Sequence, residues 1–182
     1  INMSIISNNC YGTAYSKATS KEYTTPFFSL FLYGEDYVTL LENFDELIAM
    51  DPVICEDNVS KYFKTPKKYP ILRLGEVEIH CLHDKGKTPE ESRAKWIRRR
   101  DRMDMDKSMM VVKFCDRDKF NLKLAERFLA LHNFPNKVLF VSQKWAKELG
   151  CLPGVVVTDD IKKCKEGPGL EKIYPISSIF EQ

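Results

Sequence analysis

The sequence of 182 residues lacks the short motifs that mark the commonest nucleotide-binding and hydrolase sites. It has no G-x-x-x-x-G-K-[ST] phosphate loop, no G-x-G-x-x-G turn, no G-x-S-x-G nucleophile elbow and no H-E-x-x-H helix. These absences argue against a P-loop nucleotide hydrolase, a typical dinucleotide enzyme, an α/β-hydrolase and a zincin.

A long apolar run and an excess of one charge are also missing. No apolar stretch approaches the roughly 20 residues that cross a bilayer, and no signal peptide is visible. Lysine and arginine number 28 against 26 aspartates and glutamates, which gives a formal net charge of +2. A balance this close is not typical of a general nucleic-acid or membrane-surface binder. We therefore expect no nucleic-acid partner and no membrane span.

The six cysteines are far apart and form no Cys-x-x-Cys pair. This spacing does not predict a cysteine-rich zinc site. Several of them lie in apolar runs, where cysteine usually serves as a small hydrophobic residue. Cysteines used in this way fit a reducing compartment, so we expect a cytoplasmic protein.

The length of the chain predicts one domain. A domain of this size buries a core that is stable without disulfides or metal, and we expect residues 1–182 to form a single α/β domain. The sequence begins Ile1-Asn2-Met3 rather than with an initiator methionine. Two explanations stay open: a residual tag, or excision from a longer multi-domain chain.

Apolar runs bounded by turn residues predict the strands. We expect four central strands and a last buried strand, at Met3–Ser7, Phe27–Leu32, Met109–Phe114, Val138–Ser142 and Val155–Val157. A hairpin is expected around Gly75-Glu76, between Ile71–Leu74 and Val77–Leu82.

Helices are expected between these strands. The clearest begins at Gly34 and continues through Ile48, with apolar residues at i, i+3, i+4 and i+7. A second begins at the capping sequence Thr88-Pro89-Glu90-Glu91 and should run to about Met103. Two more are expected at Asn121–His132 and Gln143–Leu149. Alternating strands and helices predict a three-layer α/β sandwich with a mainly parallel central sheet.

Ligands of open α/β sheets bind beyond the carboxyl ends of the strands. This rule points to three loops, at Ser7–Gly12, His83–Lys87 and Cys115–Lys119. In the first loop, Ser7, Asn8 and Asn9 offer hydrogen-bond donors and acceptors, although adjacent asparagines also simply form turns. In the second, His83 could act as acid or base, or have a structural role.

A basic helix is the next candidate feature. Six cationic residues crowd between Arg93 and Arg102, and four of them are expected to hold an anion: Lys95, Arg98, Arg99 and Arg102. The planar arginine fork suits bidentate binding of phosphate. The alternative is a solvated helix face paired with Glu90, Glu91, Asp101 and Asp104. Trp96 is expected to anchor this helix to the core.

The third loop contains Asp116-Arg117-Asp118. Two carboxylates separated by one residue can hold Mg²⁺ or Mn²⁺ that bridges a diphosphate. Such pairs also cap helices and shape turns. Asp116 and Asp118 are therefore candidate metal ligands and, with His83, candidate catalytic groups.

Several of these features together resemble a known family. They are Ile6-Ser7-Asn8-Asn9-Cys10-Tyr11-Gly12, Thr25-Pro26-Phe27, Asp36-Tyr37, Glu78-Ile79-His80, His83, Trp96 with Arg99 and Arg102, and Asp116-Arg117-Asp118. Their order over about residues 4–142 is similar to a bacterial exopolysaccharide-biosynthesis family of unknown function, found in capsule and lipopolysaccharide loci. Tyr11 and Asp84 depart from its pattern, which has tryptophan and tyrosine at those places.

The resemblance implies an α/β fold and a glycan setting. Combined with the arginine helix, it predicts a glycosyltransferase domain that uses a nucleotide-sugar donor and a glycan acceptor, with or without a divalent cation. Other transferase domains of a longer chain are candidate partners. Two alternatives stay open: a metal-dependent phosphodiesterase or nuclease, and a non-catalytic carbohydrate-binding module.

Overall fold

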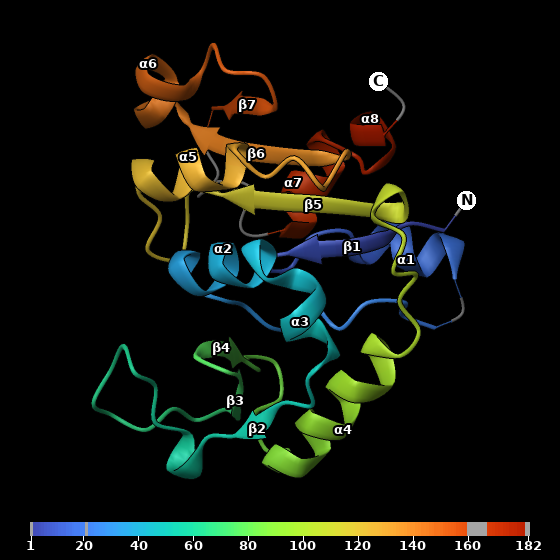
Figure 1. Cartoon of the computed structure of the whole chain (residues 1–182), viewed down its shortest axis with the longest axis vertical. Coiled ribbons are helices and arrows are strands. Elements are labelled where there is room, and N and C mark those ends of the chain that lie inside the picture. The colour runs from blue at the N-terminus through green and yellow to red at the C-terminus, as the bar shows by residue number, and fades with distance from the viewer. Residues whose placement is uncertain (1, 21, 160–166, 181–182) are drawn as a thin grey trace.

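The computed structural model describes residues 2–20, 22–159 and 167–180 (Figure 1). Its main sheet has the strand order β1-β5-β6-β7, and every neighbouring pair is parallel. The four strands are β1 (Ser4–Ser7), β5 (Met110–Cys115), β6 (Lys137–Ser142) and β7 (Val155–Thr158). The predicted mainly parallel sheet is confirmed, and the carboxyl ends of its strands share one edge.

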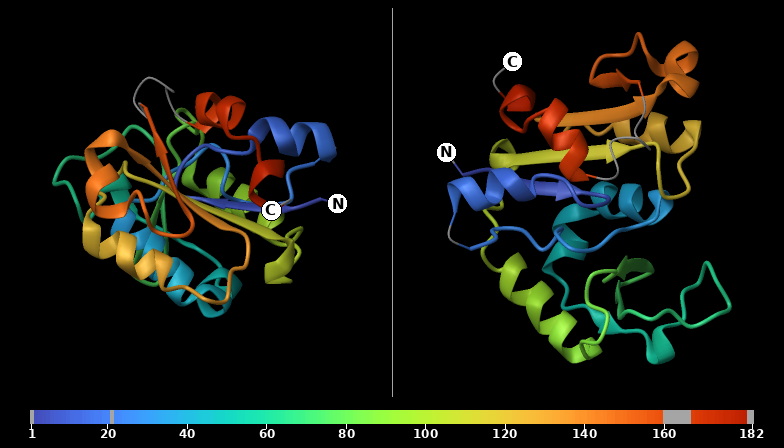
Figure 2. Two further views of the ribbon diagram at one scale, coloured as in Figure 1. Left: turned by 90° about the horizontal axis from the view of Figure 1, so that it is seen from above. Right: turned by 180° about the vertical axis from the view of Figure 1, so that it is seen from behind.

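Helices cover both faces of this sheet, which confirms the three-layer arrangement (Figure 2). On one face lie α2 (Gly34–Glu42), α3 (Phe44–Ala49) and α5 (Leu122–Leu129). On the other lie α1 (Thr13–Thr19), α7 (Gly167–Ile173) and α8 (Ser177–Phe180). Adjacent strand residues alternate between the layers, since Ile6 packs with the α2 side and Ile5 with the α7 side.

A second, antiparallel sheet lies below the first in Figure 1. It consists of β2 (Val53–Ile54), β3 (Ile71–Leu74) and β4 (Val77–His80). β3 and β4 form the predicted hairpin, in which Leu74 pairs with Val77 across Gly75-Glu76. Gly75 has φ of 57°, a left-handed conformation that glycine adopts without steric cost. Side chains of both sheets share one hydrophobic core.

The basic helix α4 (Pro89–Arg100) packs beside the small sheet. Its predicted capping box is present: the Thr88 hydroxyl accepts from the Glu91 backbone, and the Glu91 carboxylate accepts from the Thr88 backbone at 2.7 Å. The helix ends at Arg100, earlier than expected. Trp96 is buried and packs edge-on against Phe27, which confirms its predicted anchoring role.

The expected strand at Phe27–Leu32 is wrong. Ser29 has φ of 67°, which breaks an extended run, and only Phe31 pairs with another strand residue, at His80. Phe27, Phe28 and nearby leucines are nevertheless buried. The segment is apolar because it fills the core as a loop.

Several helix boundaries also differ from the sequence prediction. The helix expected from Gly34 to Ile48 is divided at Asn43, whose φ of −120° and ψ of 35° are not helical. The segment 143–149 begins as a 3₁₀ turn, Gln143–Trp145, before α6 (Ala146–Leu149). Two further 3₁₀ turns, at Glu56–Asn58 and Lys107–Met109, and helix α1 were not predicted.

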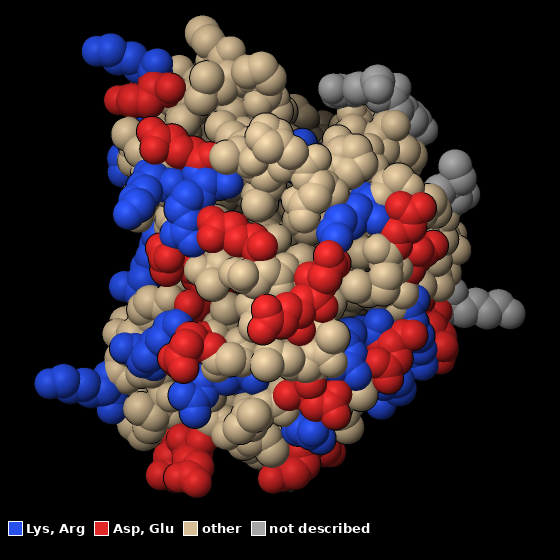
Figure 3. Space-filling model, in the orientation of Figure 1, with Lys and Arg blue, Asp and Glu red and all other residues tan. Residues whose placement is uncertain are grey.

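Acidic and basic side chains are interspersed over the face shown in Figure 3. Ion pairs account for part of this mixture, for example Arg127 with Glu35 and Glu42. Such a surface agrees with the near-neutral sequence. None of the described helices combines the length and apolar character needed to cross a bilayer.

Candidate functional site

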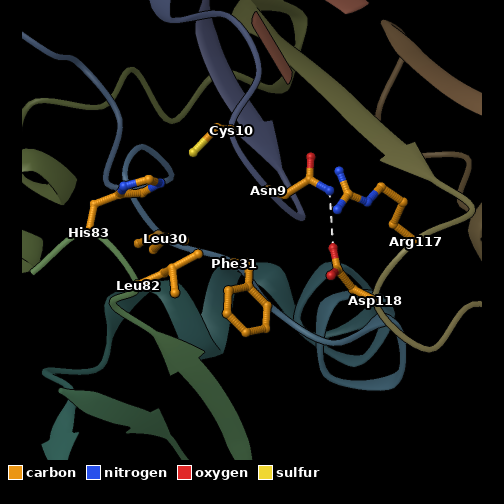
Figure 4. Close-up of a pocket in the computed structure, with 8 residues that line it drawn as sticks. All are labelled: Asn9, Cys10, Leu30, Phe31, Leu82, His83, Arg117 and Asp118. Atoms are coloured by element: carbon orange, nitrogen blue, oxygen red, sulfur yellow. Dashed lines mark hydrogen bonds between the residues drawn. The ribbon is translucent and has the colours of Figure 1, made fainter. Parts of the chain in front are cut away.

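A cavity of about 120 Å³ opens at the carboxyl edge of the main sheet. Its walls come from the loops after β1, β4 and β5 and from the segment 30–31 (Figure 4). The lining residues are Asn9, Cys10, Leu30, Phe31, Leu82, His83, Arg117 and Asp118. All three loops that the sequence singled out therefore contribute to one cavity, as expected for a parallel α/β sheet.

A buried lysine supports the floor of this region. Lys113 lies near the end of β5 and is only 1% exposed. Its ammonium donates to Asn8 Oδ1 at 3.3 Å, to Asn9 Oδ1 at 2.6 Å and to Cys115 Sγ at 3.3 Å. The Tyr11 ring lies 5.6 Å from the same ammonium. A buried ammonium needs such compensation because removing it from water is costly.

The Lys113 contacts fix the orientation of the two asparagines. An ammonium only donates hydrogen bonds, so both amide oxygens must face it. The amide nitrogens then point away and donate to Asp118 Oδ2, at 3.0 Å from Asn9 and 3.4 Å from Asn8. Two donors aimed at one oxygen stabilise a negatively charged carboxylate. Asp118 is thus held at the cavity wall by the end of β1.

Asp116 has a different role in the structure. Its Oδ2 accepts hydrogen bonds from the Ser142 backbone at 2.9 Å and from the Ser142 hydroxyl at 2.7 Å. The carboxylate therefore ties the end of β5 to the end of β6, and Asp116 does not line the cavity. No three His, Cys, Asp or Glu side chains within residues 2–20, 22–159 and 167–180 are grouped to hold a metal ion.

The His83 loop is fixed by its neighbour Asp84. This carboxylate is buried and accepts from Lys95 Nζ and, at 2.7 Å, from the Ser92 hydroxyl, both on α4. Burial opposes ionisation, but these hydrogen bonds outweigh it and lower the pKa of Asp84. Lys95 therefore anchors the loop instead of facing a ligand. His83 itself is exposed and lines the cavity.

Arg98 and Arg99 of α4, together with Arg102 just beyond its end, border a second hollow. It has a volume of about 410 Å³ and is lined by Lys17, Ser20, Glu22, Tyr23, Arg98, Arg99 and Arg102. We expected these arginines to share one cleft with Asn8, Asn9 and His83. The structure instead separates the two groups, because the last turn of α4 leads toward the start of β5 and not across the strand ends (Figure 1).

One short segment contacts a lining residue of each hollow. Arg99 Nη1 donates to the Phe28 carbonyl at 3.4 Å, and the His83 backbone donates to the Ser29 carbonyl at 3.3 Å.

Of the predicted site residues, the structure brings Asn9, His83 and Asp118 to the cavity. Ser7 and Asn8 are buried beneath it, and the Ser7 hydroxyl accepts from the Asn9 backbone at 3.4 Å. Sequence reasoning missed Lys113, Lys17 and Tyr23. A charged residue inside the apolar run Met109–Phe114 was the only sign of Lys113 that the sequence offered.

The chain belongs to a protein family described as a domain of unknown function (DUF1919), whose model matches residues 1–174. A protein of Haemophilus influenzae (strain ATCC 51907 / DSM 11121 / KW20 / Rd), described as an uncharacterized protein, is 29% identical to it over 179 residues. That match covers 98% of this chain and 74% of the relative.

Proposed function

We propose that this protein is a glycosyltransferase that moves a sugar from a nucleotide-sugar donor to a growing glycan. The cavity at the carboxyl edge of the sheet carries the proposal. Asn9 and Asp118 provide the donors and acceptors that sugar hydroxyls require. Phe31 and Leu82 add an apolar wall for the carbon face of a sugar ring.

Two further side chains supply the chemistry. In the proposed reaction, His83 takes the proton from the acceptor hydroxyl. The acceptor oxygen then bonds to the anomeric carbon while the bond from that carbon to the donor phosphate oxygen breaks. The departing diphosphate keeps the electron pair. Arg117 faces the cavity near Asn9 (Figure 4) and offsets the added negative charge.

The proposed transfer does not rely on a bound metal ion. Asp116 Oδ2 is engaged by Ser142, and of the two aspartates only Asp118 lines the cavity. A metal-dependent phosphodiesterase or nuclease would need that pair and therefore receives less support. A non-catalytic carbohydrate-binding module would need neither His83 nor Arg117 at the cavity.

We place this reaction in the cytoplasm, in the assembly of exopolysaccharide, capsule or lipopolysaccharide. The resemblance of the Ser7-Asn8-Asn9-Cys10 loop and the Trp96–Arg99 helix supports this setting, as does the absence of a cysteine pairing pattern. Other transferase domains in the same chain are the proposed partners, and the glycan acceptor is the proposed macromolecular substrate.

The test is direct turnover. Purified protein is incubated with a panel of nucleotide sugars and short glycan acceptors, and mass spectrometry detects the extended product. The variants His83→Asn and Arg117→Gln should each lower kcat/KM at least tenfold, which corresponds to about 1.4 kcal/mol. His132→Asn, at an exposed position outside the cavity, is the matched control. Unchanged rates in both cavity variants would remove the mechanism.

A further inference from the structure

The hollow between α1 and α4 concentrates positive charge. Four of its lining side chains are cationic and one is acidic, which leaves three positive charges uncompensated. The acid, Glu22, is 65% exposed at its side chain and pairs with Arg102 at 3.1 Å. An ion pair that exposed contributes little and can yield to a stronger anion.

Arginines on the same helix differ sharply in their partners. Arg93 lies 3.6 Å from the Asp51 carboxylate, and Arg100 bonds to Asp51 and Asp101 at 2.9 Å. Both arginines thus face carboxylates, and Arg100 is the more firmly held of the two because its side chain is only 14% exposed. Arg98 and Arg99, by contrast, have no carboxylate partner within the part of the chain that the structure describes.

The guanidinium group of Arg99 is fixed by contacts that do not include an ion pair. Its guanidinium carbon lies 4.6 Å from the centre of the Tyr23 ring, and its Nη1 donates to the Phe28 carbonyl. The contact with Tyr23 fixes the plane of the Arg99 guanidinium group, and its remaining N–H groups can still donate hydrogen bonds within that plane. Burial lowers the pKa of Arg99. Tyr23 and the carboxylate of Asp84 oppose this effect, whereas the charges of Arg98 and Arg102 add to it, and the net result is a lowered pKa. Hydrogen bonds to Asp101 and Asp51, in contrast, outweigh burial and raise the pKa of Arg100.

From this contrast we infer that Arg98, Arg99, Arg102 and Lys17 form a binding site for a diphosphate group. Guanidinium groups bind phosphate oxygens in pairs. Three guanidinium groups and one ammonium line the hollow and offer more N–H donors than the three terminal oxygens of a single phosphate can accept. The two phosphoryl groups of a diphosphate therefore match the hollow better than one phosphate does. This site is separate from the sugar cavity.

The proposed diphosphate site is consistent with the proposed function, but the contacts that support the site do not require that function. Because the hollow and the cavity share no lining residue, the diphosphate bound in the hollow is not the leaving group that Arg117 offsets. One source of this second diphosphate is a nucleoside diphosphate. A free diphosphate metabolite would occupy the same arginines without reaching His83.

Isothermal titration calorimetry on the whole protein tests the inference, with inorganic pyrophosphate as the probe. The double variant Arg98→Gln/Arg102→Gln should weaken binding at least tenfold. Arg93→Gln/Arg100→Gln is the matched control, because it removes the same two charges from helix arginines that already pair with Asp51. The control should bind like the wild type. Binding should also weaken as salt rises, since the site is partly open to solvent.

Titrations with other anions identify the ligand and test the diphosphate assignment. Uridine and guanosine diphosphates that bind more tightly than pyrophosphate would identify a nucleotide as the source. Sulfate that binds as tightly as pyrophosphate would overturn the diphosphate assignment, and so would equal losses in the double variant and the control. Pyrophosphate binding without any sugar transfer would leave this site standing and remove the proposed function alone.

Discussion

The Asn9 amide bridges Lys113 and Asp118: its oxygen accepts from the Lys113 ammonium at 2.6 Å and its nitrogen donates to the Asp118 carboxylate at 3.0 Å. A buried cation thereby sets which way the amide points. The amide in turn sets where the carboxylate lies at the cavity wall. Lys113 is a positioning residue in this arrangement, because it is buried and does not line the cavity.

The first prediction concerns Lys113→Met. The variant leaves two amide oxygens without their donor, at a cost of about 1–3 kcal/mol, but also removes a buried charge. These effects oppose each other, so we expect the free energy of unfolding to change by less than about 2 kcal/mol. The proposed transfer should fall at least tenfold in kcat, with a smaller change in KM, because Asp118 loses its fixed orientation.

Lys137→Met is the control for that experiment. Lys137 also lies on a strand of the main sheet, at the start of β6, and donates to the carbonyls of Leu129 and Leu131. Its removal should lower stability and leave kcat unchanged. Equal losses of kcat in the two variants would show that Lys113 acts only through stability.

The second prediction concerns the anchor of the His83 loop. Asp84→Asn removes the charge that holds Lys95, whose side chain is only 14% exposed. Breaking a buried ion pair costs about 3–5 kcal/mol, so we expect a loss near 3 kcal/mol in urea unfolding. Asp45→Asn provides the comparison, because Asp45 pairs with Lys107 at 2.6 Å on the surface and should cost less than about 1 kcal/mol. Similar losses in the two variants would contradict the proposed anchor.

The third prediction is a loss of stability in mild acid. His80 is fully buried, stacks on Phe31 and suits a neutral imidazole: Nε2 donates to Glu78 at 3.0 Å and Nδ1 accepts from Tyr69 at 3.2 Å. Burial lowers the pKa of His80, and Glu78 offsets this only in part. As the pH falls, His80 therefore binds its proton in the unfolded chain at a higher pH than in the folded protein. Stability is full above pH 6.5 and falls as the pH decreases below it, by up to about 1.4 kcal/mol per unit.

Urea unfolding at pH 7 and pH 5 measures this effect. The variant His80→Gln should show a flatter dependence over that interval, whereas His132→Gln, at an exposed position, should follow the wild type. The pKa of Asp84 is lowered, so its carboxylate becomes protonated only below this pH range. Its contribution to stability is therefore lost at more acid pH. An identical slope in wild type and His80→Gln would assign the effect to other groups.

Local patterns explain what the sequence predicted correctly. The capping box at Thr88 and the hairpin at Gly75 depend on residues a few positions apart, so their meaning does not need the rest of the fold. The strands β1, β5 and β6 are apolar because both of their faces are covered. The contribution of the loops after β1 and β5 to the cavity followed from the parallel sheet, whereas His83 comes from the loop after β4 of the antiparallel sheet.

The sequence predictions were wrong for features whose structure depends on tertiary contacts. Phe27–Leu32 has the composition of a strand, but its side chains are buried from a loop that Ser29 interrupts. The arginines of α4 look alike in sequence, yet Asp51, more than 40 residues away, neutralises Arg93 and Arg100 and leaves Arg98 and Arg99. Helical spacing cannot reveal a partner that lies so far along the chain.

The last prediction separates the two aspartates of the Asp116-Arg117-Asp118 turn. Asp116 holds Ser142 through two hydrogen bonds, so Asp116→Ala should destabilise the protein by about 1–3 kcal/mol. Asp118→Asn should leave stability nearly unchanged, because Asn8 and Asn9 can still donate to the remaining oxygen. It should lower kcat/KM at least tenfold, because the cavity loses an acceptor for the sugar hydroxyls. Since arginine offsets the leaving-group charge in the proposed mechanism, chelation with EDTA should not slow the wild type. A requirement for Mg²⁺ or Mn²⁺ that both substitutions weaken would instead show that the two carboxylates share a metal during the transfer.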